Sequence, residues 1–182
     1  MQEDANWIVL EDQDSIFDSE LEDRPAQLAK PDGTPSKKWS TVKTVLRQIP
    51  TSELHYVDVP DDHIVIDFDL TDQDGNKSLD RNLEAASAWP PTYAEVSKSG
   101  QGLHLHYIFD GDTETLANEY SEGIEVKVYR GNASLRRKLT LCNNHPIAHI
   151  SSGLPRKEKK VASEQYMQTE RSIRDLIDRN LR

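Results

Sequence analysis

The sequence feature that most constrains the fold lies at residues 64–70, where an apolar run leads into two acids. Residues 64–66 are Ile, Val and Ile, and β-branched apolar residues favour a buried strand. Side chains alternate along a strand, so Asp67 and Asp69 point to one face while Phe68 points to the other. The pattern predicts a core strand that carries two carboxylates side by side.

Two adjacent carboxylates repel each other, so this pair needs a compensating charge. A hard cation such as Mg²⁺ or Mn²⁺ supplies it, because these ions take oxygen ligands and keep positions open for substrate phosphates. Two solvated acids at the end of a strand would give the same short pattern. The Asp67/Asp69 pair therefore indicates a metal site only in combination with later segments.

The whole chain sets limits on fold and function. Its 182 residues suit one ordinary α/β domain. Its formal net charge of −10 argues against coating nucleic acid by bulk electrostatics, although a local basic groove remains compatible. A single cysteine, Cys142, excludes an intrachain disulfide and argues against a cysteine-based zinc site. No signal peptide or membrane-length apolar run is present, so we expect a cytoplasmic protein without membrane contact.

Periodicity predicts an N-terminal module over residues 1–55, a sheet-forming core over 56–155 and a C-terminal helix over 161–182. Strands are expected over 7–10, 53–59 (as an edge strand), 62–70, 92–98, 103–109 and 124–129, with two more inside 137–151. Helices are expected over 41–48, 78–88, 113–120 and 163–181.

A glycine turn before the strand at 103–109 is a candidate anion site. Gly100 and Gly102 let backbone N–H groups approach a phosphate closely, and Ser99 adds a hydroxyl donor. His104, on the outgoing strand, adds a ring donor. An ordinary hairpin turn would have the same sequence.

An acid in a later strand would complete the site. Glu125 lies between two apolar residues of an alternating segment, where it would form a carboxylate triad with Asp67 and Asp69. Three carboxylates beside a phosphate-binding turn suit two-metal nucleotidyl transfer, in which the ions activate the attacking hydroxyl and stabilise the leaving pyrophosphate. Glu125 alone would equally be a solvent-facing residue.

Positive charge gathers late in the chain. Residues 126–160 contain nine Lys or Arg and one acid, Glu158. The cluster of Arg136, Arg137 and Lys138 gives a local positive field suited to a triphosphate and a template backbone.

A different interpretation concerns His104 and His106. They share one strand face and would form a His-x-His zinc or manganese site.

Three segments in order resemble the three motifs of archaeo-eukaryotic primases: Asp67-Phe68-Asp69, Ser99-Gly100-Gln101-Gly102-Leu103-His104 and Ile124-Glu125-Val126. The closer resemblance is to the primase–polymerase domains of phage and plasmid replication proteins, and it covers roughly residues 55–155. It implies an α/β (α+β) primase fold in which an RRM-like mixed or antiparallel sheet carries the motifs beside a small N-terminal module. Residues 1–160 would form this catalytic domain.

The resemblance also implies an activity, namely template-directed nucleotidyl transfer that makes primers on single-stranded DNA. It implies roles residue by residue: two Mg²⁺ or Mn²⁺ ions held by Asp67, Asp69 and Glu125, and nucleotide contacts from Ser99, Gly100, Gly102, His104, Arg137 and Lys138. Partners would be a single-stranded DNA template, an NTP or dNTP, and a replicative helicase or fused helicase domain. The alternatives are a metal-dependent nuclease and a non-catalytic RRM-like module that binds nucleic acid.

Overall fold

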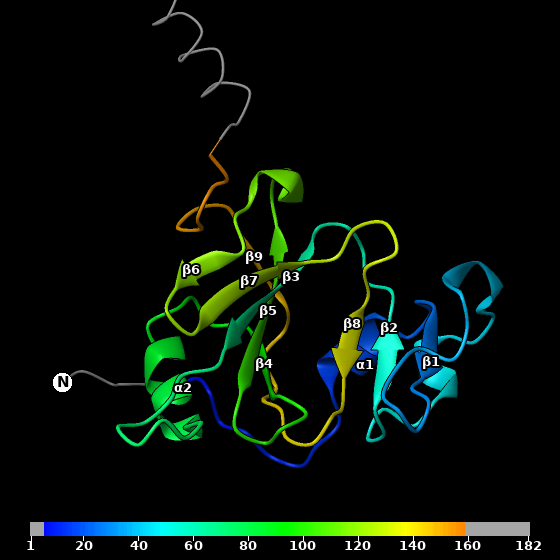
Figure 1. Ribbon diagram of the computed structural model, residues 1–182, viewed down its shortest axis with the longest axis horizontal. Coiled ribbons are helices and arrows are strands. Elements are labelled where there is room, and N and C mark those ends of the chain that lie inside the picture. The colour runs from blue at the N-terminus through cyan, green and yellow to red at the C-terminus, as the bar shows by residue number, and fades with distance from the viewer. Residues whose placement is uncertain (1–5, 159–182) are drawn as a thin grey trace, which may run out of the picture.

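The computed structural model describes residues 6–158 (Figure 1). The chain is a mostly antiparallel β-sheet protein with few short helices, built from a six-stranded and a three-stranded sheet. The α/β class predicted from the sequence therefore overstated the helical content, because the two α-helices have five and eight residues. The helix predicted over 161–182 lies outside the described residues. No helix in the described part is long and apolar enough to cross a membrane.

The six-stranded sheet has the order β4-β5-β3-β7-β6, and β9 pairs with β5. All neighbours are antiparallel except β9, which runs parallel to the second half of β5, while β4 pairs with the first half. The strands are β3 (His63–Phe68), β4 (Tyr93–Val96), β5 (Leu103–Phe109), β6 (Glu119–Ser121), β7 (Ile124–Val128) and β9 (Ala148–Ile150).

The three-stranded sheet has the order β1-β2-β8 and joins distant parts of the chain. Its strands are β1 (Ala26–Leu28), β2 (His55–Val57) and β8 (Leu135–Arg137). The predicted edge strand at 53–59 is therefore the central strand of this sheet. The predicted boundary between the N-terminal module and the core, at residue 55, runs through this three-stranded sheet. Strand β1 lies before the boundary, and β8 lies some 80 residues after it. No local pattern could show this pairing.

The two faces of β3 belong to different hydrophobic clusters. Ile64 and Ile66 pack in the cluster that includes Ala86 of α2 (Leu79–Ala86). Val65 packs in the cluster that includes Phe17 of α1 (Ile16–Glu20) and residues of the small sheet. Figure 1 shows α2 and the small sheet on opposite sides of the central strands.

Four predictions differ from the structure. Of the two strands predicted inside 137–151, only β9 is present, because β8 ends at Arg137. Residues 7–10 form no strand. In place of the helix predicted over 41–48, the structure has two short 3₁₀ turns, Trp39–Thr41 and Leu46–Gln48. Half of the residues in 41–48 are β-branched, and these disfavour a helix. The segment 113–120 splits into a 3₁₀ turn, Thr113–Thr115, and the start of β6.

Candidate functional site

Three predicted site residues lie in one row across the large sheet. In the strand register, Asp67 of β3 is opposite His104 of β5 on one side and Glu125 of β7 on the other. Residues directly opposite each other share a face and have Cβ atoms about 4.5–5.5 Å apart. The Nε2 atom of His104 lies 3.2 Å from Oδ1 of Asp67. Segments far apart in sequence thus bring two acids and a histidine together.

Each carboxylate contacts a different nitrogen-bearing side chain. In addition to the contact between Asp67 and His104, Lys77 Nζ lies 3.6 Å from Asp69 Oδ1, and Lys127 Nζ lies 2.6 Å from Glu125 Oε2. Within residues 6–158, the three acids do not form a group with all ligand atoms inside 4.8 Å. The acids are therefore neighbours whose negative charge is compensated by side chains of the chain itself.

The surroundings of Asp67 favour the ionised form of its carboxyl group. Burial raises the pKa of this carboxyl, but the contact with His104 and the positive charges of Lys127 and Lys77 outweigh that effect, so the pKa lies below its ordinary value. Asp67 is therefore ionised at neutral pH and able to bind a cation.

A cavity of about 400 Å³ opens beside this row. Seven of the nine predicted site residues line it: Asp67, Asp69, Ser99, Gly102, His104, Arg137 and Lys138. Glu125 and Gly100 are not among the lining residues. The lining contains six Lys or Arg side chains and three acids. Three of these cations were not predicted: Lys77, Lys98 and Lys127. The volume and the excess of positive charge suit a small anionic ligand.

The glycine turn is built differently from the predicted phosphate cradle. Gly100 has a φ of +81°, which favours glycine. At Gly102 an added Cβ would lie 2.5 Å from Ser97 Oγ, so a larger residue here would displace the Ser97 side chain. The N–H of Gly102 donates to Ser97 Oγ, and that of Gly100 donates to the Ser97 carbonyl. Because these N–H groups are used inside the turn, an anion here would depend on side chains such as Ser99.

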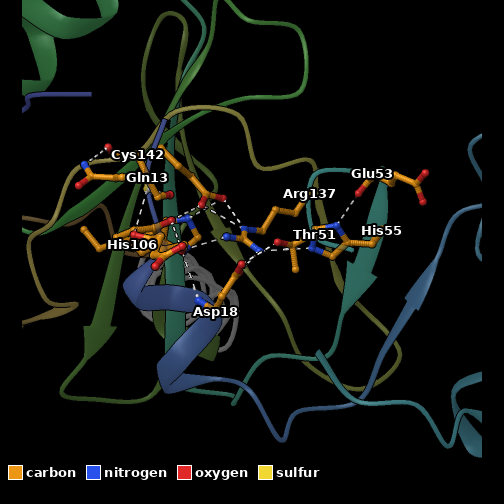
Figure 2. A network of polar contacts seen from close by, with 12 residues as sticks. Gln13, Asp18, Thr51, Glu53, His55, His106, Arg137 and Cys142 are labelled. Atoms are coloured by element: carbon orange, nitrogen blue, oxygen red, sulfur yellow. Dashed lines mark hydrogen bonds and ion pairs between the residues drawn. The ribbon is translucent and has the colours of Figure 1, made fainter. Parts of the chain in front are cut away.

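Arg137 has a different role from the one predicted. It is 2% exposed, with Nε 2.8 Å from Glu95 Oε1 and Nη1 2.6 Å from Asp18 Oδ1. Figure 2 shows its guanidinium at the centre of a network that also reaches His55. Alternation along β8 explains the placement, since Arg136 is exposed where Arg137 is buried. Arg137 thus connects α1 to the large sheet, and the predicted contact between Arg137 and a nucleotide does not fit its position.

Glu95 is a buried acid that the sequence analysis missed. It is 1% exposed, accepts a hydrogen bond from Tyr93 Oη at 2.5 Å and from Arg137, and lies opposite His104 in the register. Burial raises the pKa of its carboxyl, but the Arg137 charge and the contact with His106 bring it well below the ordinary value. The available signal was an acid inside an otherwise apolar strand, and only the pairing of β4 with β5 showed its neighbours.

We expect acidic pH to destabilise the fold, because three histidines are buried. Burial is the main cause that lowers the pKa of His55, His63 and His106. Below pH 6.5 the histidines of the unfolded chain bind protons that the buried histidines of the folded chain do not bind. The free energy of unfolding therefore decreases as the pH is lowered, by up to about 1.4 kcal/mol per pH unit for each histidine. We expect the urea midpoint, measured in chelator, to drop between pH 7 and pH 5.

The exposed His149 provides the control for this pH effect. Its pKa is raised by the hydrogen bond and charge of Asp110, so it does not share the behaviour of the buried rings. The variant His149→Gln should keep the drop between pH 7 and pH 5, whereas His63→Phe should reduce it. An unchanged midpoint in the wild-type chain over this range would show that the buried rings do not resist protonation.

Comparison of the chain with known protein families and with curated proteins finds no match. A functional assignment therefore depends on the chemistry of the row, the cavity and the order of the motifs.

Proposed function

We propose that the protein is a metal-dependent nucleotidyltransferase of the primase–polymerase class, acting on a single-stranded DNA template. The observation that supports this most is the cross-strand row of Asp67, Glu125 and His104 beside a cavity whose lining has more Lys and Arg than acidic side chains. An acid pair alone is common, but this row beside an anion-suited cavity combines the two requirements of nucleotidyl transfer.

The donor set of the row fits Mg²⁺ or Mn²⁺. Asp67, Asp69 and Glu125 would hold the ions, since carboxylate oxygens are the ligands that these metals prefer. Lys77 and Lys127 form ion pairs with Asp69 and Glu125, and bound divalent ions would take the place of these two ammonium groups. When bound, the ions would activate the attacking hydroxyl and stabilise the leaving pyrophosphate.

The remaining side chains would bind and orient the nucleotide. His104 is held by Asp67 at the cavity wall, where its ring can donate to a phosphate oxygen. Lys98, Arg136 and Lys138 are exposed side chains of the same cavity and would neutralise the triphosphate. Ser99 adds a hydroxyl at the turn. Arg136 replaces Arg137 in this proposal, because strand alternation leaves Arg136 accessible.

The architecture is compatible with the primase fold that the motifs imply. Such a fold has an RRM-like sheet carrying the acids and an N-terminal module beside it. Here α2 covers one face of the six-stranded sheet, and α1 with the small sheet covers part of the other. A replicative helicase, as a separate protein or a fused domain, would be the partner that exposes the template.

A template-directed synthesis assay tests this proposal. The full chain is incubated with labelled nucleotides, Mn²⁺ and a single-stranded DNA template, and we expect labelled products longer than the input nucleotides, with none in EDTA. Shortening of an end-labelled strand without added nucleotides would favour the nuclease. DNA binding that is equal with and without chelator, and no nucleotide consumption, would favour a non-catalytic module.

A further inference from the structure

A buried imidazole beside the cavity has an unused ligand atom. His106 is fully buried, and within residues 6–158 its Nε2 atom has no hydrogen-bond partner. Its other ring nitrogen, Nδ1, lies 2.8 Å from His63 Nε2. A buried polar atom without a partner costs about 1–3 kcal/mol, so such an atom points to a ligand that the side chain can bind.

Two further ligand groups face this atom. Glu95 of β4 and His104 of β5 are register partners, and His104 and His106 share one face of β5. The ligand atoms of Glu95, His104 and His106 all lie within 4.8 Å of one another, with Glu95 Oε1 3.5 Å from His106 Nε2. Zinc bonds of about 2.0–2.2 Å place neighbouring ligands of a tetrahedral ion about 3.4 Å apart, which matches this separation.

The surroundings resemble the support that metal ligands receive in proteins. The second ring nitrogen of a metal-binding histidine is normally hydrogen-bonded to another polar group, and Nδ1 of His106 shares a hydrogen bond with Nε2 of His63. The Glu95 carboxylate is held in place by Arg137 and Tyr93. Asp18 and Asp67 add two carboxylates in contact with this group, through Arg137 and His104 respectively.

We propose that Glu95, His104 and His106 form a zinc-binding site, distinct from the acids that would hold Mg²⁺ or Mn²⁺. Two imidazoles and one carboxylate leave a fourth position for water, and imidazole nitrogen favours Zn²⁺ over Mg²⁺. The site shares His104 with the nucleotide cavity. If the proposed function holds, zinc therefore withdraws His104 from the nucleotide and inhibits synthesis.

Direct zinc titration tests the site without any activity measurement. The full chain, stripped of metal, is titrated with ZnCl₂ in competition with a chromophoric chelator. We expect one tight site, with affinity at least tenfold weaker in His104→Ala and His106→Ala. His149→Ala removes an exposed histidine outside the cluster, and Glu125→Gln removes an acid of the other site. Both of these variants should bind zinc as the wild-type chain does.

His104→Ala decides the test if His106→Ala fails to fold, because the His104 side chain is 17% exposed and lies at the edge of the core. Equal zinc affinity in the wild-type chain and His104→Ala would overturn the site. Loss of binding in Glu125→Gln would assign the zinc to the acids instead. Either result counts against the cluster whether or not the chain makes DNA.

Inhibition is tested separately in the synthesis assay. With Mn²⁺ present, equimolar zinc should reduce synthesis by the wild-type chain, and chelation should restore it. Full synthesis with the zinc site occupied would overturn the inhibitory role. Absence of synthesis before zinc is added would contradict the proposed function, and the titration would still decide the zinc site.

Discussion

Replacing Arg137 with methionine is expected to lower the free energy of unfolding by about 3–5 kcal/mol, because removal of one partner leaves the buried Glu95 carboxylate without a counter-charge. Glu95 is 1% exposed and accepts a hydrogen bond from Arg137 Nε at 2.8 Å. In the variant, the Asp18 carboxylate also loses the hydrogen bond that it accepts from Arg137 Nη1. Methionine keeps most of the aliphatic volume of arginine, so the decrease in unfolding free energy would come from the lost charge and not from a cavity. Urea unfolding followed by circular dichroism measures the change.

The neighbouring arginine provides a matched control. Arg136→Met removes the same charge one residue away, at an exposed position, and should change the unfolding free energy by no more than about 0.5 kcal/mol. Adding Glu95→Gln to Arg137→Met should recover part of the loss, since it removes the unpaired charge. Equal destabilisation by the two arginine variants would show that the network around Arg137 contributes little to stability.

Asp67→Asn is expected to reduce template-directed synthesis at least 100-fold while changing the unfolding free energy by less than about 1 kcal/mol. The amide keeps the size of the side chain but removes a charged metal ligand, and metal stabilisation of the transition state is worth several kcal/mol. Stability should change little because the lost contact with His104 is offset by relief of repulsion between Asp67 and the facing Glu125. Initial rates and urea midpoints of the same preparation measure both effects.

Asp80→Asn makes the same chemical change away from the cavity. Asp80 lies exposed in the first turn of α2, and it does not line the cavity. This variant should retain full synthesis. Full activity in Asp67→Asn would exclude the proposed metal role of the acid row, and a large loss of stability would mean that the contact between Asp67 and His104 is structural.

Several elements followed from local patterns in the chain. The apolar run that ends in Asp67, the alternation around Glu125 and the run at 103–109 all correspond to strands of the large sheet. The helix at 78–88 corresponds to α2 with Ser78 as its N-cap, where the side chain accepts a hydrogen bond from the N–H of Arg81. These patterns act over a few residues, so short-range sterics and burial are sufficient to predict them.

The roles of Glu95 and Arg137 did not follow from such patterns. Alternation separates Arg136 from Arg137, but it does not say which side of β8 meets α1 and which meets solvent. That choice depends on β2 pairing with β8 and on β4 pairing with β5, contacts between distant segments. The residue types and their order along the chain thus predicted the strands that carry Asp67, His104 and Glu125, while the chemistry of these side chains stays a prediction. Which charged groups are buried, and which acid faces the two histidines, was settled by long-range strand pairing, because burial depends on the element that covers each face.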